Sequence, residues 1–446
     1  MRLARGVVSA AAIGLMLVGI AGCDTIGGWF EEDDAPPLPG ERLSILALEP
    51  QIAADPEIQD VSVVLPQPYL NPDWPQPGGA PDRAMHHLEA PEVLGVAWAA
   101  NVGDASDDDI RIVSPPIVAE GRVFAVDAGG SVTALDAGSG AQLWQFDPRP
   151  DDDDGGFGGG LAYSGNRLFA ANGYGDVYGL DPATGEVAWK QPLLVPIRAA
   201  PVVSGGRVFV VSYDNQTWAL DGRDGAVLWT HAGLGETARL LGAASPAVER
   251  DTVIVPYSSG EIYALRADNG RVIWSESLST SAIGGTGLAE LNTINGSPVI
   301  DRGLVFAISH GGRLAAFDIL TGNRVWEQGL SGTNTPWVAG EFLFVVTADG
   351  EVVCLSRDRG RIRWVQALPG FEDPEDREDP ITWSGPILVS DRLVVVSSTG
   401  QAVALSPYDG HVLGQVALPE GARVGPIVAN GTVYVLTEDA DVVALR

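Results

Sequence analysis

From residue 93 to the end of the chain, short apolar segments alternate with groups of turn-forming residues. In residues 201–229, for example, four short segments alternate apolar and polar side chains, and Gly- and Asp-rich turns separate them. A period of two indicates β-strands with one buried face, and the helical period is not sustained at any point after Pro91. The pattern therefore predicts an all-β body built from four-stranded units.

The four-stranded unit is repeated eight times. Each copy contains an apolar anchor residue, usually preceded by alanine, and successive anchors are about 44 residues apart on average. The anchors are Leu135, Leu180, Leu220, Leu265, Phe317, Leu355, Leu405 and Leu445. A glycine stands five residues after each of the first seven anchors, and a tryptophan stands nine residues after each of the first six. This period and strand content are typical of the blades of a β-propeller.

We therefore expect an eight-bladed β-propeller of four-stranded antiparallel blades. The blades are expected at residues 116–144, 161–189, 201–229, 246–274, 298–326, 336–364, 386–414 and 426–446. The last blade lacks a fourth strand, because the chain ends one residue after its anchor. Residues 93–98 resemble the final strand of the other blades, so the N-terminal strand is expected to complete the eighth blade and close the ring. Closure leaves only short, protected sheet edges.

Tryptophans occupy the same register in successive blades. They are Trp98, Trp144, Trp189, Trp229, Trp274, Trp326 and Trp364. The seventh repeat has Gly414 at this position. Recurrence in a fixed register favours packing between neighbouring blades over stacking on a ligand, and each buried indole covers roughly 150–250 Å².

The composition argues against nucleic acid as a partner and against a fold held together by disulfides. The chain has 446 residues and a net charge of −31, and Lys190 is the only lysine among 27 basic residues. Such an acidic surface repels a phosphate backbone, so nucleic acid is not an expected partner. Only two cysteines are present, Cys23 and Cys354, which excludes a disulfide framework. Cys354 precedes an anchor, where most repeats have alanine, so we expect it to be a small buried core residue.

The first 22 residues have the features of a signal peptide. Arg2 and Arg5 precede an apolar stretch at residues 7–20, which is shorter than the roughly 20 residues of a membrane-spanning helix. The following Ile-Ala-Gly-Cys sequence, which ends at Cys23, resembles a bacterial lipobox. This resemblance implies cleavage before the cysteine, a diacylglycerol thioether on its sulfur and acylation of its amino group. Several acyl chains together would anchor the protein stably to a membrane.

Residues 23–91 are predicted to be an acidic, proline-rich tether. Twelve prolines occur from Pro36 to Pro91, after a run of four acidic residues. Proline disfavours helices and central strands, and proline-rich segments tend to be extended spacers. We expect the second half, from about Leu70, to dock onto the globular body at residues 92–446.

Motifs for catalysis or metal binding are not found. The five histidines lack the spacing of metal ligands, and the acidic run at residues 151–154 does not fit a calcium-binding EF-hand loop. The sequence Gly173–Tyr178 fails the dinucleotide-binding pattern, and no nucleophile elbow or phosphate-binding loop is present. We therefore expect no catalytic residue, no metal site and no cofactor.

The repeat resembles that of quinoprotein-like propellers, as in residues 179–189, Gly-Leu-Asp-Pro-Ala-Thr-Gly-Glu-Val-Ala-Trp. Two families share this repeat: the quinone-dependent alcohol and glucose dehydrogenases, and BamB, the propeller lipoproteins of the outer-membrane β-barrel assembly machinery. The alcohol dehydrogenases carry a vicinal cysteine pair and clustered calcium ligands, which this sequence lacks. This sequence combines a lipobox, a tether, eight blades and a closing strand, and in this combination it resembles the BamB family. The alternatives are a general adaptor of the cell envelope and, less favoured, a dehydrogenase-like enzyme.

The resemblance to BamB implies a non-catalytic scaffold at the periplasmic face of the outer membrane, held there by the lipid anchor. The implied role is to aid the folding and insertion of outer-membrane β-barrel proteins. The implied partners are BamA, through its periplasmic POTRA domains, the other subunits of the assembly (BAM) complex, and unfolded outer-membrane protein precursors. We expect a monomeric subunit within that complex.

In that family, an apolar element with an arginine before the third blade and an acidic pair before the fifth blade contact BamA. Val195, Ile197 and Arg198 match the first element, and we expect them to be exposed. The second element departs from the family, since Thr293 and Asn295 stand where the family has two aspartates. Arginine suits such a contact because its guanidinium binds carboxylates and carbonyls in a fork. The alternative is that Arg198 pairs within the propeller.

Mass spectrometry of the protein isolated from membranes tests the lipobox interpretation. The mature N-terminus at Cys23 should carry acyl groups, and Cys23→Ser should abolish them because the thioether requires the thiol sulfur. Wild-type protein without an acyl adduct on Cys23 would contradict the predicted anchor.

Overall fold

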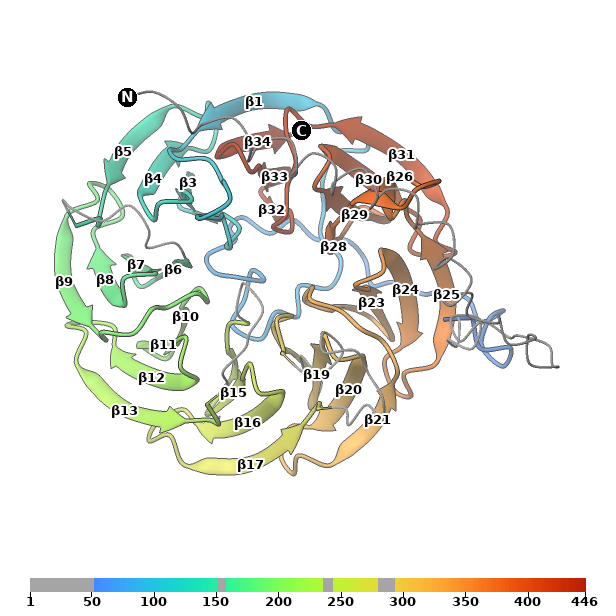
Figure 1. The fold of residues 1–446 in the computed structure, drawn as a ribbon, viewed down its shortest axis with the longest axis horizontal. Coiled ribbons are helices and arrows are strands. Elements are labelled where there is room, and N and C mark those ends of the chain that lie inside the picture. The colour runs from blue at the N-terminus through green and yellow to red at the C-terminus, as the bar shows by residue number, and fades with distance from the viewer. Residues whose placement is uncertain (1–51, 151–157, 236–243, 280–292) are drawn as a thin grey trace, which may run out of the picture. The chain divides into compact units, whose positions relative to one another are not determined.

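A computed structural model of the protein describes residues 52–150, 158–235, 244–279 and 293–446. Residues 52–446 form one compact unit. Within the described residues, 32 strands form eight antiparallel sheets of four strands each, and two further strands form a separate hairpin. Figure 1 shows the eight sheets arranged as the blades of a ring. The predicted eight-bladed propeller is confirmed.

The first four blades each run from the inner to the outer strand in chain order. Blade 1 contains β2 (Ile117–Ala119), β3 (Arg122–Val126), β4 (Val132–Asp136) and β5 (Gln142–Phe146). Blade 2 contains β6 (Gly159–Ser164), β7 (Arg167–Asn172), β8 (Asp176–Leu180) and β9 (Val187–Pro192). Blade 3 contains β10 (Val202–Ser204), β11 (Arg207–Val211), β12 (Gln216–Asp221) and β13 (Val227–Ala232). Blade 4 contains β14 (Ala247–Glu249), β15 (Thr252–Pro256), β16 (Glu261–Arg266) and β17 (Val272–Ser277).

The next three blades follow the same order, and the eighth takes its outer strand from the N-terminal side. Blade 5 contains β18 (Val299–Asp301), β19 (Leu304–Ser309), β20 (Arg313–Asp318) and β21 (Arg324–Gln328). Blade 6 contains β22 (Trp337–Ala339), β23 (Phe342–Val346), β24 (Glu351–Ser356) and β25 (Ile362–Ala367). The hairpin of β26 (Phe371–Asp373) and β27 (Glu378–Pro380) follows. Blade 7 contains β28 (Trp383–Val389), β29 (Arg392–Ser397), β30 (Gln401–Leu405) and β31 (Val412–Ala417). Blade 8 contains β32 (Ile427–Ala429), β33 (Thr432–Leu436), β34 (Asp441–Leu445) and β1 (Val96–Asn101).

Burial follows the position of a strand in its blade. In β11, a middle strand, Val208, Phe209 and Val210 are all fully buried, because both faces of the sheet pack against neighbouring blades. In the outer strand β13, Val227 is 43% exposed whereas Trp229 is 8% exposed. The outer strands therefore keep one buried face, which carries the tryptophan.

The N-terminal strand closes the ring. β1 pairs antiparallel with β34, so that Trp98 lies opposite Ala444 and Val96 lies opposite Leu445. The register shifts between these two pairs, as it does between the two outer strands of every other blade. β1 therefore stands in the position of an outer strand, as the repeat predicts.

The closing strand is displaced along the chain from the residues at which we expected it, 93–98. It spans Val96–Asn101 because its partner spans Asp441–Leu445, and the ladder of hydrogen bonds covers that length. Gly95 and Arg446 exchange one further pair of backbone hydrogen bonds of 2.9 Å each.

Seven tryptophans join neighbouring blades. Each lies in an outer strand, and its indole N–H donates a hydrogen bond of 2.8–3.3 Å to a carbonyl two residues after the anchor of the next blade. The pairs are Trp98–Ala137, Trp144–Pro182, Trp189–Gly222, Trp229–Ala267, Trp274–Ile319, Trp326–Arg357 and Trp364–Pro407. Each indole is thus oriented by a hydrogen bond as well as by packing.

The glycine five residues after each anchor leaves room for the indole. At Gly270 the backbone has a φ of +71°, and a Cβ placed there would lie 2.6 Å from Cε3 of Trp229. The same close approach occurs at the other six glycines of this position. We call the tryptophan and the glycine on which it lies a docking pair.

The junction between blades 7 and 8 has no docking pair in the described structure. Blade 7 carries Gly414 where other blades have tryptophan, so its outer strand has no indole to lay on the next blade. Instead, the guanidinium of Arg392 in blade 7 donates to the carbonyls of Pro91 and Glu92, just before β1. The junction between blades 7 and 8 is therefore held by different contacts.

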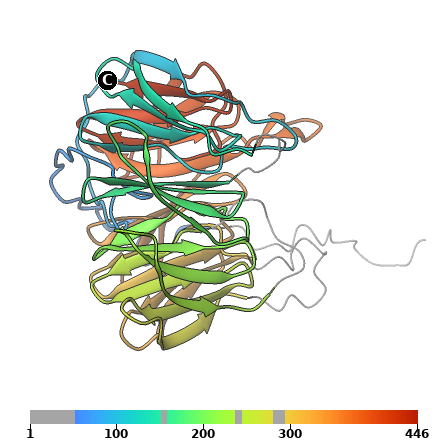
Figure 2. The ribbon, with the colours of Figure 1, turned by 90° about the vertical axis from the view of Figure 1, so that its left-hand side faces the viewer.

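The antiparallel order places two kinds of connection on opposite faces. The links between blades, such as residues 193–201, lie on one face, which we call the linker face. The turns between the first two strands of each blade, such as Gly205-Gly206, lie on the other, which we call the turn face. Figure 2 shows residues 52–91 in blue on the turn face and the β26–β27 hairpin on the opposite side.

Several sequence features fall outside the described residues, among them Cys23, residues 1–22 and the acidic run at 151–154. Residues 52–91, which the proline content assigns to the tether, belong to the same compact unit as the blades. No helix in the described ranges has the length and apolar character needed to cross a bilayer.

Gly270→Ala should destabilise the propeller more than Gly303→Ala. Both glycines have a positive φ, which disfavours alanine by roughly 1 kcal/mol or more at either position. Only at Gly270 does the new methyl group meet an indole, since a Cβ at Gly303 has no neighbour within 4 Å. The contact of this methyl group with the indole should lower the free energy of unfolding by a further ~1–3 kcal/mol. Chemical denaturation followed by circular dichroism measures the difference, and equal losses would contradict the packing role of the docking pair.

Candidate functional site

The link between blades 2 and 3, residues 193–198, is hydrogen-bonded to turns on both sides. The Leu193 amide donates to the Gly175 carbonyl at 2.7 Å, and the Tyr213 amide donates to the Pro196 carbonyl at 2.7 Å. The link contains three of the five residues that we expected to contact a partner.

Exposure differs among these three residues. Val195 and Arg198 are partly exposed, but the expected exposure of Ile197 is wrong, because its side chain is fully buried. Ile197 forms an isolated bridge with Ser212 and packs into the apolar core between blades 2 and 3. The Arg198 guanidinium lies over the Tyr213 ring, with its central carbon 4.7 Å from the ring centre. A cation over an aromatic face is attracted by the ring quadrupole, which orients the guanidinium.

Three apolar side chains on the same face of the propeller as Arg198 are exposed, although the strand pattern singles none of them out. Leu194 is 85% exposed, Leu234 is 63% exposed and Tyr213 is 42% exposed. Asn215, in the same turn as Tyr213, donates a side-chain hydrogen bond of 2.6 Å to the Leu234 carbonyl. We call Leu194, Arg198, Tyr213 and Leu234 the linker-face patch. Leu194 belongs to a run of three apolar residues outside any strand, and this run is the sequence signal that could have revealed it.

The link to blade 5 places the other two expected contact residues away from this patch. Thr293 is 2% exposed, and its carbonyl accepts a hydrogen bond of 3.0 Å from the His310 amide. The Thr293 side chain is therefore buried in this structure, since the chain turns inward here to reach β18, and its contact with a partner stays a prediction. Asn295 lines a cavity in the central channel. Blade 4 separates both residues from Arg198.

Residues 69–90, which we call the channel segment, cross the inner strands of all eight blades (Figure 1). In blade order the hydrogen-bonded pairs are Trp74–Val118, Pro75–Tyr163, Gln76–Val203, Pro81–Val248, Asp82–Ile300, His86–Trp337, Leu88–Leu388 and Asn71–Val428. The inner strands are sheet edges, whose unpaired backbone groups need partners. A proline-rich segment can bind these strand edges because most of the contacts use carbonyls of the segment rather than its N–H groups.

The segment bends around the side chain of Arg83. Gly78 has a φ of +75°, and a Cβ there would overlap the aliphatic part of Arg83. Arg83 is 3% exposed, and its Nη1 donates to the Pro246 carbonyl at 2.6 Å. Trp74 stacks on Trp337, with ring centres 6.3 Å apart and planes inclined by 11°. Aromatic packing and one buried arginine thus fix the segment inside the ring.

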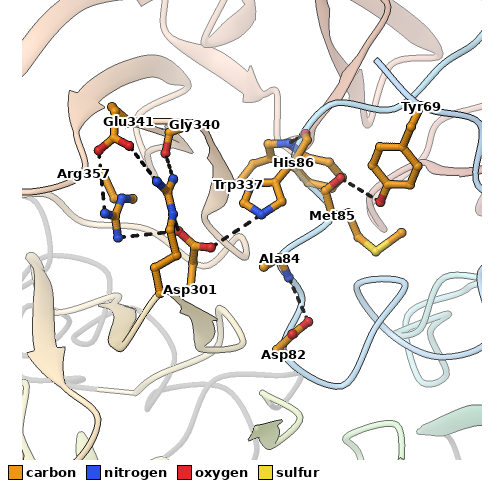
Figure 3. Close-up of polar contacts among 11 residues, drawn as sticks. Tyr69, Asp82, Ala84, Met85, His86, Asp301, Trp337, Gly340, Glu341 and Arg357 are labelled. Atoms are coloured by element: carbon orange, nitrogen blue, oxygen red, sulfur yellow. Dashed lines mark hydrogen bonds and ion pairs between the residues drawn. The ribbon is translucent and has the colours of Figure 1, made fainter. Parts of the chain in front are cut away.

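A group of charged side chains fastens the channel segment to blades 5 and 6 (Figure 3). The Asp301 carboxylate, 5% exposed, lies 3.0 Å from Nε of Arg302 and 3.5 Å from both Nη1 of Arg357 and Nε2 of His86. Glu341 pairs with the same two arginines, and the hydrogen bond from Arg302 lowers the pKa of its carboxyl. A buried carboxylate needs such donors around it. These charged side chains therefore attach the channel segment to blades 5 and 6.

The channel holds a cavity of about 220 Å³, which we call the channel cavity. Trp74 and Arg83 of the channel segment line it, together with residues that precede the inner strands of the blades. Within the described ranges, no three His, Cys, Asp or Glu side chains are placed to hold a metal ion. Cys354 is fully buried, and burial raises the pKa of its thiol well above the ordinary value, so it is not a ready nucleophile.

Comparison with known sequences gives a match to one family over nearly the whole propeller. The family model described as "Outer membrane protein assembly factor BamB" matches residues 96–154, 128–366 and 374–446. A relative of that name from Yersinia pestis is 28% identical over 356 residues, which cover 76% of this chain and 88% of the relative. A relative of the same name from Xanthomonas campestris pv. campestris is 25% identical over 453 residues, which cover 98% of this chain and 97% of the relative.

Solved structures share the fold. The crystal structure of BamB from Moraxella catarrhalis has a TM-score of 0.67 at 22% identity and covers 79% of this chain and 100% of its own. The quinohemoprotein alcohol dehydrogenase from Comamonas testosteroni has a TM-score of 0.62 at 14% identity and covers 82% of this chain and 76% of its own. At these identities the likeness concerns the fold alone.

Trp74→Ala should loosen the channel segment without unfolding the blades. Removal of a buried tryptophan that stacks on Trp337 costs roughly 3–5 kcal/mol of packing, and its contacts lie between the segment and the inner strands. Hydrogen exchange followed by mass spectrometry should show faster exchange at covered amides such as Val118 and Val248, with β12 unchanged. Leu70→Ala, at a side chain that is 51% exposed, is the control. The same exchange pattern in both variants would contradict the role of Trp74.

Proposed function

Because the chain belongs to the BamB family of outer membrane protein assembly factors, we propose that it is a scaffold subunit of the complex that folds and inserts outer-membrane β-barrel proteins. The linker-face patch carries this proposal, because it offers exposed apolar surface and an arginine on a hydrogen-bonded link. Large apolar side chains gathered around an arginine are typical of protein interfaces, where a few such residues supply most of the binding energy.

The proposed role is non-catalytic. The channel segment occupies the turn-face end of the channel and is bonded to all eight inner strands. The channel cavity, at about 220 Å³, is smaller than the roughly 300–1,000 Å³ of a typical small-molecule site. A dehydrogenase must hold a cofactor and a substrate side by side, and this space does not suit both.

The partner at the linker-face patch is BamA, in contact through its POTRA domains. A guanidinium stacked on an aromatic ring, as Arg198 is on Tyr213, can donate from its edge to carboxylates and carbonyls of a second protein. Leu194 and Leu234 supply apolar area on the two neighbouring links. The other subunits of the complex and unfolded barrel precursors are further partners in this proposal.

The proposed location is the periplasmic face of the outer membrane. Residues 1–22 are removed as a signal peptide, and Cys23 carries the acyl groups that hold the protein at the membrane. Residues 23–91 lead from this anchor to the propeller at residues 92–446, and the channel segment is the last part of that connection.

Arg198→Glu should weaken the binding of the protein to purified POTRA domains by roughly thirtyfold or more. The reason is that loss of an interface anchor costs about 2 kcal/mol or more, and about 1.4 kcal/mol corresponds to a tenfold change in affinity. Leu194→Ala should also weaken binding, since it removes exposed apolar contact area and leaves the arginine in place. Isothermal titration of the protein against the POTRA domains measures both effects.

Arg223→Glu is the matched control for the charge reversal. Arg223 lies in a turn on the opposite face, and its side chain is 87% exposed. The substitution changes the net charge by the same amount and should leave binding unchanged. All three variants should keep a stability within about 0.5 kcal/mol of the wild type, as is usual for surface substitutions. Unchanged binding of a folded Arg198→Glu variant would place the interface elsewhere on the propeller.

A further inference from the structure

We propose that the channel cavity binds a small oxyanion, with Arg83 as its principal ligand. The ligand is a molecule of a few heavy atoms that bears a carboxylate or phosphate group. This inference goes beyond the scaffold role and does not depend on it.

Arg83 is a buried cation that forms no ion pair within the described residues, and the one charge that acts on it is that of the neighbouring Asp82. Its side chain is 3% exposed, and Nη1 donates to the carbonyls of Pro246 at 2.6 Å and Pro298 at 3.4 Å. Nη2 is buried and has no hydrogen-bond partner in the described part of the chain. Neutral carbonyls do not neutralise a guanidinium, and a buried charge without a counter-ion is unfavourable. Burial lowers the pKa of Arg83 to about 9, so the group is still charged at neutral pH.

The charge of Asp82, the neighbouring acidic residue, partly offsets the effect of burial on the pKa of Arg83, but the two side chains form no ion pair. The Asp82 carboxylate accepts a hydrogen bond of 3.2 Å from the Ala84 amide (Figure 3). Arg83 itself is held with a φ of +63°, in the left-handed region, and its aliphatic part packs on Gly78. Residues with a strained backbone cluster at binding sites, and here the strained residue brings a buried guanidinium without an ion-pair partner to the wall of a cavity.

Among the described residues, none that lines the channel cavity is acidic, although the chain has 58 acidic residues against 27 basic ones. It contains a second arginine, Arg423, whose Nε pairs with Glu438 at 2.9 Å and which we therefore assign a weaker contribution. Hydroxyl and amide groups complete the wall, and they include Ser114, Ser245, Ser297, Asn334 and Thr335. Guanidinium and hydroxyl donors around a space without carboxylates form the environment that oxyanions prefer.

Trp74 supplies a further donor. It is 2% exposed and lines the same cavity, and its buried Nε1 has no acceptor among the described residues. Buried N–H groups are nearly always hydrogen-bonded in folded proteins, so a missing acceptor at this position requires an explanation. Trp74 and Arg83 both line the cavity, so an oxyanion there would offer acceptors to the donors of its wall.

The size of the cavity limits the ligand. About 220 Å³ is less than the roughly 300–1,000 Å³ that hold drug-sized molecules. A phosphate ion or a short carboxylic acid fits this space, whereas a nucleotide or a large cofactor does not.

Isothermal titration of the Cys23→Ser protein, which carries no thioether-linked lipid, tests the proposal with sodium phosphate, sodium acetate and sodium succinate. Ionic strength is held constant with sodium chloride, so that screening is the same in every titration. We expect saturable binding of at least one of these anions at one site per chain. Tighter binding of phosphate would identify a phosphate-bearing ligand, and tighter binding of acetate or succinate would identify a carboxylate-bearing one; both results support the site.

Two variants and one control assign the binding to the cavity. Arg83→Gln should weaken the binding of the anion roughly tenfold, which corresponds to about 1.4 kcal/mol. Because this variant also loses the bond to Pro246, its melting temperature without added anion is measured in parallel. Thr333→Trp changes an exposed residue of the cavity wall, leaves Arg83 intact and should reduce binding by filling the space. Arg223→Gln, on the turn face, should leave binding unchanged.

The absence of saturable binding for all three anions would overturn the proposal. Equal affinities in the wild type, Arg83→Gln and Thr333→Trp would also overturn it. If Arg83→Gln does not fold, the titration of Thr333→Trp decides the question. The binding of POTRA domains is measured separately, so a failure of the scaffold proposal would leave this result unaffected.

Discussion

The docking pair, an indole laid on a glycine of the next blade, is the contact on which the propeller depends. A four-stranded blade cannot bury both of its faces alone, so every blade needs two neighbours whose surfaces fit its own. The glycine admits the ring, and the carbonyl that accepts the indole N–H sets its orientation, as in Trp229 with Gly270 and Ala267. Repetition of this contact at seven junctions fixes the spacing between blades, and that spacing determines whether the ring closes after eight.

Closure creates a second requirement at the centre of the ring. Eight inner strands bring eight sheet edges together there, and each edge needs partners for its backbone groups. The channel segment meets this requirement with one continuous piece of chain, whose carbonyls accept hydrogen bonds from amides such as those of Tyr163, Val248 and Ile300. A segment rich in proline suits this position because it presents acceptors and few donors. The channel cavity, with Arg83 in its wall, is the space that remains after the edges are covered.

The sequence predicts the blades because their signals are local: the anchor, the glycine and the tryptophan lie within ten residues of one another. It misplaces the closing strand by three residues because the length of pairing is set by β34, at the other end of the chain. The burial of Ile197 depends on its bridge to Ser212, and no pattern within the link distinguishes it from exposed Leu194. Arg83 stands in the half of the tether that we expected to dock onto the body, but its burial could not be predicted, because the eight strand edges that receive this stretch come from later in the chain.

The path of the chain also determines how the propeller bears a mechanical load. A pull from the N-terminal side first reaches residues 52–63, which are bonded to blade 6 through Arg361 and Arg363. It next meets the channel segment, whose contacts are spread over all eight blades, and only then β1. The strand β1, whose pairing with β34 closes the ring, therefore comes last in the order of loading. A propeller tethered by its N-terminus can be pulled without the force first peeling away the strand that keeps the ring shut.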